Sequence, residues 1–358
     1  MTFIEFTEHI TSQYQADLPF VIYRKPDISE VYAYLQQDSI LHFTANYKTN
    51  GFVMASFDLT ESYIIPKTAS KQIKAIFQPS ESDKSTEIGE TALELEASKV
   101  THLRLVEKGI TAIKEGKFKK VVLSRKETIA QKNRENYILI FERMLNTYPN
   151  AFVYVWYHPQ VGMWAGATPE TFFSLTDNEL TTMALAGTQA YLPDEEVHWR
   201  AKEKNEQQLV TDFIVASLQP VSKTLNVTSP YTVRAGNLWH IRSDIKAVKK
   251  ETVSNAKLIQ ALHPTPAVCG LPKDAAKNFI LQHEGYPRKF YTGFLGIIAE
   301  DAERKLIDLF VNLRCMELQP DKVLLYIGGG ITLDSDPEEE WKETVKKAGT
   351  MKNVLGLS

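Results

Sequence analysis

AFVYVWYHPQVGMWAGATPETFFSLTDNELTTMALAGT, residues 151–188, is the stretch that decides the fold class. It holds four short apolar segments, rich in aromatic and β-branched residues, and only turn-forming residues separate them. No helix-length segment lies between them, as the regular alternation of a parallel βαβ fold would require. The stretch therefore predicts an α+β fold with large antiparallel β-sheets packed together and surrounded by helices, and it disfavours a Rossmann-type fold.

The same pattern extends to both sides of this stretch. Residues 1–78 alternate short apolar segments with turn-forming residues, which predicts a run of short antiparallel strands. Apolar residues at helical spacing predict helices over 92–114, near 195–220 and from about Pro337, whereas the polar stretch 79–91 is predicted to be an exposed loop. Further strands are expected at KKVVLSRKETI (119–129), LWHIRSDI (238–245), YTGFLGIIA (291–299), LIDLFVNL (306–313) and KVLLYIGGGI (322–331).

Composition excludes several classes of protein. Of the 358 residues, 43% are hydrophobic and 24% are charged, which is typical of a globular chain. The formal net charge of −3 provides no basic field for phosphates, so we expect no nucleic-acid partner. Glu5 and Glu8 stand where a signal peptide has basic residues, and no apolar run reaches membrane-spanning length, so we expect a cytoplasmic protein without a membrane partner. Cys269 and Cys315 are too few for a disulfide framework and lack the spacing of a zinc site.

A glutamate on the apolar face of the helix near 195–220 is the first sign of a functional site. At about 100° per residue, Glu206 falls beside Val210 and Phe213. A buried carboxylate without a partner costs a large amount of free energy, so Glu206 needs a cation, strong hydrogen-bond donors or a metal ion. The alternative is that Glu206 lies at the first buried turn and reaches solvent.

The last helix carries a second group of charged residues. Asp336 followed by Pro337 indicates a capped helix start. Glu340, Glu343 and Lys347 project along one edge of the apolar stripe, although an exposed Glu343–Lys347 ion pair is the alternative interpretation. The stripe itself consists of Trp341, Val345, Ala348 and Leu355. Acidic residues from two helices supply only oxygen ligands, which favour Mg²⁺ over zinc.

Three further segments place reactive groups on a strand or a turn. Lys119 and Lys120 are predicted to lie on opposite faces of a strand. Either lysine could simply be exposed to solvent beside the strand, whereas a buried Lys120 could lose its proton and act as a general base. Glu170 follows a Thr-Pro turn, which either aims its carboxyl into a site or is an ordinary surface turn. Three glycines at 328–330 leave backbone N–H groups open to an anion, with a simple tight turn as the alternative.

Nine segments taken together resemble the chorismate-utilising family, which includes isochorismate, salicylate, anthranilate and aminodeoxychorismate synthases. The resemblance covers residues 92–358, and residues 1–91 match no motif of the family. It implies a fold like that of anthranilate synthase component I, with residues 1–91 as the N-terminal β-rich part and 92–358 as the chorismate-binding catalytic region of one structural domain. The segments are KVVLSR (120–125), GATPE (166–170), LAGT (185–188), NEQQLV (205–210), LWH (238–240), HPTPAVCGLP (263–272), NLRC (312–315), GGGI (328–331) and EEWKETVKK (339–347).

The resemblance implies a role for each matched residue. The family's water-activating lysine corresponds to Lys120 and its general acid to Glu170. The magnesium carboxylates correspond to Glu206 and Glu343, with Glu340 as a direct or water-mediated ligand. The other matched positions border the substrate: Arg314, Lys347 and Gly328 at the enolpyruvyl carboxylate, Gly187 and Thr188 at the ring carboxylate, and His240 and Tyr291 beside the ring. Lys120 would activate water for attack at C2, while Glu170 protonates the departing C4 hydroxyl.

Differences within the family favour an isochorismate synthase. Anthranilate synthases tend to carry glutamine in place of Lys120, and aminodeoxychorismate synthases tend to carry lysine in place of Ala186, so no amidotransferase subunit is expected. His263 resembles isochorismate synthases more than salicylate synthases, which usually have phenylalanine there. Salicylate synthase stays the first alternative, and a catalytically inactive chorismate-binding homologue the second. We expect a monomer, serving menaquinone or siderophore biosynthesis.

Overall fold

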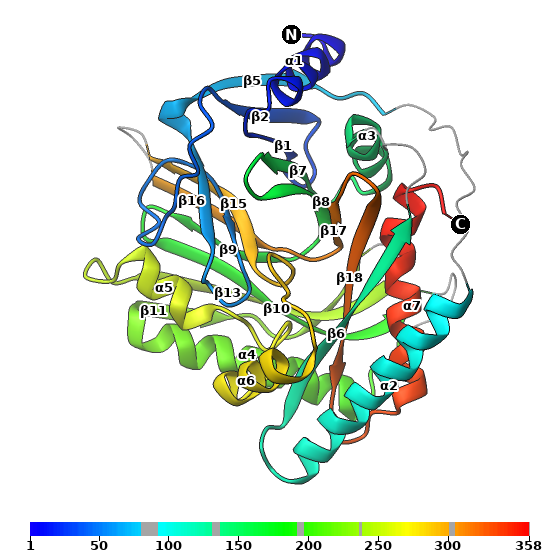
Figure 1. Ribbon diagram of the computed structural model, residues 1–358. Coiled ribbons are helices and arrows are strands. Elements are labelled where there is room, and N and C mark those ends of the chain that lie inside the picture. The colour runs from blue at the N-terminus through cyan, green and yellow to red at the C-terminus, as the bar shows by residue number, and fades with distance from the viewer. Residues whose placement is uncertain (80–91, 131–136, 192–196, 236–237, 301–304, 358) are drawn as a thin grey trace.

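Two large antiparallel sheets organise the chain (Figure 1). The computed structural model describes residues 1–79, 92–130, 137–191, 197–235, 238–300 and 305–357. Helices flank the sheets, and they are α1 (Phe3–Gln15), α2 (Ala92–Lys114), α3 (Tyr137–Thr147), α4 (Ala201–Leu218), α5 (Asn255–Leu262), α6 (Lys273–His283) and α7 (Pro337–Val354), with single 3₁₀ turns at Lys67–Ala69 and Gln219–Val221. The predicted α+β fold with antiparallel sheets is confirmed.

The first sheet has nine strands and contains the glycine-rich segment. Its order is β14 (Gly270–Leu271), β6 (Lys120–Ala130), β18 (Lys322–Ile331), β17 (Cys315–Leu318), β8 (Gly162–Thr168), β7 (Phe152–His158), β1 (Phe20–Arg24), β2 (Glu30–Gln36) and β5 (Ser70–Ile76). Strands β6 and β18 pair along ten residues, from Val121 opposite Ile331 to Ala130 opposite Lys322. This long ladder aligns the two segments that carry a lysine and three glycines.

The second sheet also has nine strands. Its order is β11 (Ser222–Val227), β13 (Leu238–Lys249), β10 (Glu179–Ala190), β9 (Thr171–Thr176), β16 (Lys305–Val311), β15 (Phe294–Glu300), β3 (Gly51–Ala55) and β4 (Ser62–Pro66), and β12 (Tyr231–Ala235) pairs with β13. The N-terminal strands enter both sheets, because β1 pairs with β7 and β3 pairs with β15.

Alternation along the strands builds one core between the sheets and others beneath the helices. Val21 of β1 and Phe52 of β3 point into the core between the sheets, and their neighbours point outward. Helices α1, α3 and α7 cover the outer face of the first sheet, whereas α4 and α5 cover that of the second. Helices α2 and α6 pack at the end of β6, around Val121 and Leu123. The end of β6 is therefore enclosed on several sides, as Figure 1 shows.

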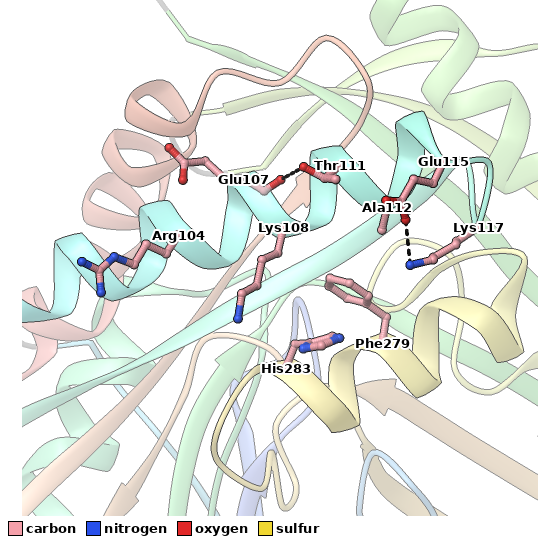
Figure 2. A pocket seen from close by; sticks show the side chains of 9 residues that line it. All are labelled: Arg104, Glu107, Lys108, Thr111, Ala112, Glu115, Lys117, Phe279 and His283. Carbon is pink, nitrogen blue, oxygen red and sulfur yellow. Dashed lines mark hydrogen bonds and ion pairs between the residues drawn. The ribbon is translucent and has the colours of Figure 1, made fainter.

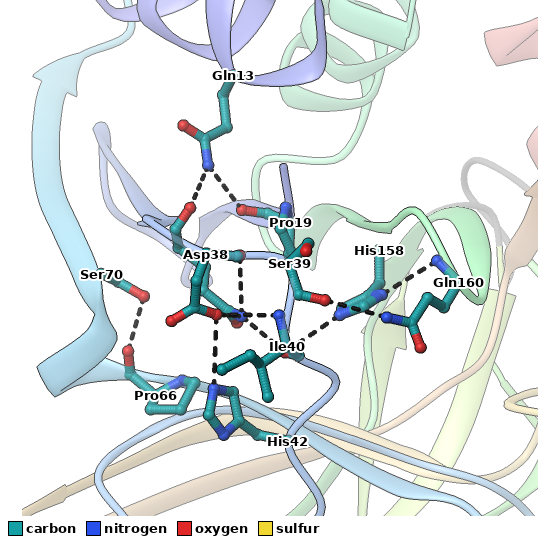
Figure 3. A network of polar contacts seen from close by, with 11 residues as sticks. Gln13, Pro19, Asp38, Ser39, Ile40, His42, Pro66, Ser70, His158 and Gln160 are labelled. Carbon is teal, nitrogen blue, oxygen red and sulfur yellow. Dashed lines mark hydrogen bonds and ion pairs between the residues drawn. The ribbon is translucent and has the colours of Figure 1, made fainter. Parts of the chain in front are cut away.

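Helix α1 is an element that the sequence analysis did not predict. Its capping box was the available signal, since Thr2 Oγ1 accepts from the amide of Glu5 and Glu5 Oε2 accepts from that of Thr2. Figure 3 shows how α1 is fastened: Gln13 Nε2 donates to the carbonyls of Pro19 (3.0 Å) and Gln36 (2.6 Å). The predicted loop at 79–91 lies, apart from its first residue, outside the described residues.

Helix α7 begins as predicted but turns a different face to the core. Asp336 Oδ1 accepts from the amide of Glu339 at 3.0 Å, which caps the helix. Val345 was predicted in the buried stripe and is 42% exposed, so that prediction is wrong. Thr344 is buried in its place and accepts a 2.8 Å hydrogen bond from Nε of Arg125 on β6. This polar contact rotates the helix away from a purely apolar alignment.

Among the described helices, none combines the length and the apolar character needed to cross a membrane.

Close packing in the second sheet predicts an effect on stability. Gly296 of β15 has φ +145°, and a Cβ there would lie 2.1 Å from the carbonyl oxygen of Asp308. Gly296→Ala should therefore lower the free energy of unfolding by about 1–3 kcal/mol. Gly349→Ala is the control, because open space surrounds this helical glycine and alanine favours the helix by roughly 1 kcal/mol. Urea unfolding measures both, and equal midpoints for the two variants would contradict the packing argument.

Candidate active site

Lys120 and Glu206 meet at the centre of the candidate site. Lys120 begins β6 and is 3% exposed, and its Nζ donates a 2.7 Å hydrogen bond to Oε1 of Glu206 on α4. Burial opposes ionisation of Glu206, but Lys120 outweighs it and holds the pKa of that carboxyl below its usual value. Lys119 is exposed on the other face of the strand. The partner that Glu206 requires is therefore a lysine ammonium within this structure.

The three glycines of β18 form a surface on which the charged side chains lie. They belong to the strand itself, which continues to Ile331, so the alternative of a simple tight turn is wrong. An added Cβ would lie 3.0 Å from Lys120 Cε at Gly330, 3.3 Å from Glu340 Oε2 at Gly329, and 2.7 Å from the Tyr291 hydroxyl at Gly328. A side chain at Gly328 would force the Tyr291 hydroxyl to shift, and one at Gly329 or Gly330 would be in tight contact with Glu340 or Lys120.

Helix α7 contributes two carboxylates and a lysine. Glu340 is 8% exposed, and its Oε1 accepts a 2.6 Å hydrogen bond from Ser335 Oγ. Burial raises the pKa of Glu340, and the nearby Glu343 adds to the rise. Lys347 Nζ donates to Glu343 Oε1 at 2.5 Å and to the carbonyl of Gly328 at 3.1 Å. The Glu343–Lys347 ion pair of the alternative interpretation is therefore formed. Its lysine also donates to the backbone of β18, so the pair is not a surface contact alone.

Glu170 is a carboxyl whose surroundings favour the protonated form. It follows β8, and its amide donates to Thr168 Oγ1 at 3.3 Å. Burial raises the pKa of Glu170 to about 7, although the cations of Lys120 and Arg314 oppose the rise. A carboxyl with this pKa is protonated in a substantial fraction of molecules at neutral pH, so it can serve as a general acid.

Arg314 is a half-buried cation that is available to an anion. Its backbone has φ +46°, which turns the chain sharply before β17. Within the described residues, its guanidinium has no hydrogen-bond or ion-pair partner. Burial lowers the pKa of Arg314, while Tyr291, Glu343 and Glu170 favour its charged form. A desolvated guanidinium with free donors suits a bidentate carboxylate.

His240 joins the site from the second sheet. Its Nδ1 lies 3.2 Å from Thr188 Oγ1 and 3.3 Å from the carbonyl of Gly187, which has φ +72° at a bulge of β10. Burial lowers the pKa of His240 to about 4, and the cations of Arg314 and Lys347 contribute to the decrease. The imidazole is therefore neutral at pH 7.

Tyr291 and His263 have different surroundings. Tyr291 is 3% exposed and stacks on Tyr326 at 5.7 Å between ring centroids, with its hydroxyl against Gly328. His263 packs among phenylalanines, and its Nε2 lies 2.8 Å from the carbonyl of Phe57. The aromatic rings around His263 are those of Phe57, Phe172 and Phe294. His263 therefore belongs to the core and can influence the site only through packing.

The donor atoms are compatible with a magnesium ion. No group of three His, Cys, Asp or Glu side chains lies close enough to hold a metal among the residues that the structure describes. Glu206 and Glu343 are instead paired with Lys120 and Lys347, and Lys347 also interacts electrostatically with Glu206 and Glu340. The site thus offers carboxylate oxygens in contact with ammonium groups, and oxygen is the ligand type that Mg²⁺ prefers.

Two residues near the carboxylates were missed by the sequence analysis. Lys202 lies one helical turn before Glu206 and interacts electrostatically with both Glu206 and Glu340. Ser335 donates to Glu340, as described above. The four-residue spacing from Lys202 to Glu206 was a usable signal, whereas Ser335 is brought to Glu340 only by the loop before α7.

A groove elsewhere on the surface is separate from this site. A hollow of about 560 Å³ lies between α2 and α6, and no predicted site residue lines it. Figure 2 shows the side chains around it. Its lining carries both signs of charge: Arg104, Glu107, Lys108, Thr111, Ala112, Glu115, Lys117, Phe279 and His283.

Residues 21–353 match the model of a protein family described as chorismate binding enzyme. The chain belongs to this family. Isochorismate synthase DhbC of Bacillus subtilis is 30% identical over 279 residues, which cover 70% of this chain and 67% of DhbC. Isochorismate synthase MenF of Escherichia coli is 31% identical over 264 residues, or 71% of this chain and 60% of MenF. A salicylate biosynthesis isochorismate synthase of Pseudomonas aeruginosa is 32% identical, and the match covers 70% of this chain and 53% of that protein. The matched region thus spans less than two thirds of the last two relatives.

Solved structures confirm the fold. A putative 2,3-dihydroxybenzoate-specific isochorismate synthase, DhbC of Bacillus anthracis, superposes with a TM-score of 0.79 at 23% identity, covering 97% of this chain and 100% of that one. Anthranilate synthase component I of Streptococcus pneumoniae gives 0.67 at 18% identity, covering 93% and 89%. The predicted likeness to anthranilate synthase component I is therefore correct at the level of fold.

The raised pKa of Glu170 predicts a pH-dependent change in stability. Because its folded-state pKa of about 7 lies above the usual 4.5, the stability contributed by this group is present at low pH and lost as pH rises through 7. Glu170→Gln resembles the neutral acid, so it should raise Tm more at about pH 8 than at about pH 5. Thermal unfolding with the exposed Glu179→Gln as control measures the difference. An equal shift at both pH values would contradict the raised pKa.

Proposed function

We propose that this chain is an isochorismate synthase, which converts chorismate to isochorismate. The observation that carries the proposal is a candidate base together with a candidate acid. Lys120, at the position of the base, is buried, and the pKa of Glu170, at the position of the acid, is raised to about 7. The electrostatic influence of Lys120 on Glu170 supports the assignment of both groups to one site. Isochorismate synthases from Bacillus subtilis and Escherichia coli among the relatives support the same assignment.

The proposed reaction exchanges one hydroxyl for another across the ring. Lys120 takes a proton from water as the water oxygen bonds to C2 of chorismate. The ring double bonds shift, the bond from C4 to its hydroxyl oxygen breaks, and Glu170 gives its proton to that oxygen, so that water leaves. One water enters and one departs, and no oxidant or organic cofactor is needed. Lys120 must be neutral at the moment of attack, which requires another cation to replace it beside Glu206.

Substrate binding would use the two cations that lie beside the glycine strand and the tyrosine. The enolpyruvyl carboxylate would be held by Arg314, Lys347 and the backbone at Gly328, because the half-buried guanidinium has no partner among the described residues and Lys347 already lies at Gly328. The backbone and hydroxyl at 187–188 would border the ring carboxylate. His240 and Tyr291 would enclose the ring, His240 as a neutral imidazole.

We propose Mg²⁺ as the required metal, held by Glu206 and Glu343 with Glu340 as a direct or water-mediated ligand. Bound there, the ion supplies positive charge for the ring carboxylate of the substrate. Its ligands would exchange their present lysine partners for the metal, which would release Lys120 from Glu206. The pairing of these carboxylates with ammonium groups supports the proposal, because it shows that the site is built to hold positive charge.

Residues at two positions separate this proposal from others within the family. This chain has Lys120 at the position where anthranilate synthases tend to carry glutamine. It has Ala186 at the position where aminodeoxychorismate synthases tend to carry lysine. We therefore propose that the enzyme needs no amidotransferase subunit. We also propose that it is a monomer, that it acts in the cytoplasm, and that it serves menaquinone or siderophore biosynthesis.

Product analysis tests the proposed activity and its metal. Purified chain given chorismate and Mg²⁺ near neutral pH should form a reversible mixture of chorismate and isochorismate with little pyruvate, and EDTA should abolish turnover until Mg²⁺ is restored. Liquid chromatography measures isochorismate, and lactate dehydrogenase coupling measures pyruvate. Stoichiometric pyruvate with fluorescent salicylate would indicate a salicylate synthase instead. Binding of chorismate without any turnover would indicate the inactive homologue.

Two adjacent lysines provide a matched test of the base. Lys120→Ala should lower kcat by about 10²–10⁴-fold while chorismate still binds, because a positioned general base typically contributes this much. Lys119→Ala should leave kcat nearly unchanged, since Lys119 is exposed on the opposite face of β6. Steady-state kinetics and ligand-observed NMR measure the two quantities. If Lys120→Ala retains normal kcat, the base is another group, with His240 as the next candidate.

A further inference from the structure

The outer edge of β6 lacks a full neighbouring strand just beyond Lys120. Strand β14 has two residues and pairs only with Lys120 and Val121. The amide of Val122 then donates to the carbonyl of Cys269 at 2.7 Å. In the part of the chain that the structure describes, no strand continues along this edge. The backbone groups that follow therefore need other partners.

A buried ion pair supplies those partners. Ser124 donates from its amide to Oε1 of Glu284 at 2.8 Å, and Arg288 Nη2 donates to the carbonyl of Val122 at 2.7 Å. Glu284 and Arg288 are paired with each other, and each side chain is 1% exposed. A carboxylate accepts where a strand carbonyl would accept, and a guanidinium donates where a strand amide would donate. The pair thus continues the hydrogen-bond ladder of the missing strand.

The hydrogen bonds of this pair are saturated. All five N–H donors of Arg288 are used: two on Glu284, and one each on the carbonyls of Val122 and Val268 and on Thr292 Oγ1. Glu284 Oε1 accepts in addition from Ser124 Oγ at 2.9 Å. A buried ion pair often adds little to stability compared with apolar packing. Such complete bonding, which ties the Arg288 segment to β6 and to Val268, instead indicates control of geometry.

The contacts of the pair extend to the glycine strand. The guanidinium of Arg288 lies 5.8 Å from the ring of Tyr291, and the amide of Tyr291 donates to the carbonyl of Arg288 at 3.0 Å. The hydroxyl of Tyr291 lies against Gly328, which pairs with Ser124 across the β6–β18 ladder. The Glu284–Arg288 pair, strand β6, Gly328 and Tyr291 are therefore joined by a closed ring of contacts.

We propose that Glu284 and Arg288 are positioning residues that set the distance between the Lys120 strand and Tyr291. Neither touches the reacting groups assigned above, so they act through Ser124, Val122 and Tyr291. The inference rests on the proposed function for its effect on turnover, because misplacing a catalytic group by about 1 Å can cost 10²-fold in rate.

Arg288→Lys tests the pair against a matched control. The variant keeps the charge but loses the planar fork and two of the five donors. Arg24→Lys makes the same change at a 3% exposed arginine of β1, which donates to the carbonyls of Leu145 and Tyr148 and is separated from β6 by four strands of the sheet. Both variants should lose Tm to a similar extent. We expect kcat to fall about 10–100-fold in Arg288→Lys only, with chorismate binding weakened less than turnover.

Hydrogen exchange provides a measurement that does not depend on turnover. In Glu284→Gln, the acceptor of the Ser124 amide is weakened, so exchange should rise in the peptide covering 119–125 and remain unchanged around Arg24. Normal kcat in Arg288→Lys, or unchanged exchange at 119–125 in Glu284→Gln, would overturn the proposal. If the wild-type chain makes no isochorismate, the proposed function fails by itself, and the exchange result still decides whether the pair positions β6.

Discussion

The ladder between β6 and β18 is the constraint on which the rest of the site depends. It joins residues about two hundred positions apart and aligns Ser124 with Gly328 and Val122 with Gly330. The absence of side chains on β18 leaves room for Lys120 on one face and for Glu340 on the other. If the register moved by one residue, these faces would exchange and the charges would be separated.

Burial explains why the pKa values of Glu170 and His240 differ from their usual values. The same enclosed surroundings raise the pKa of Glu170 and lower that of His240, because both groups lose hydration when charged. Glu206 behaves differently, since Lys120 touches it and compensates for burial. The pKa values of the two carboxyls therefore shift in opposite directions, because Lys120 donates a hydrogen bond to Glu206 but influences Glu170 only electrostatically.

Several local features could be predicted from the sequence because they depend on neighbours in the chain. The strands, the start of α7 at Asp336 and the helix over 92–114 follow from turn residues, capping and apolar spacing. Val345 was misplaced because its exposure depends on how α7 meets Arg125 and not on the helix alone. The motif around His263 indicated a kind of enzyme but not the surroundings of the side chain, which the fold encloses among phenylalanines.

The sequence by itself determined where the candidate site residues stand in the local structure: a lysine at a strand start, a glutamate on an apolar helix face, and glycines at 328–330. The sequence could not decide whether these side chains face a site or solvent. Periodicity assigns a residue to one face of a helix or strand, but it does not say what that face contacts. Only the tertiary structure decided that Lys120 reaches Glu206, that Lys347 joins Glu343 to the glycine strand, and that Arg314 stays unpaired among the described residues. The physical reason is that these contacts join segments distant in the chain, and their geometry follows from how sheets and helices pack around one another.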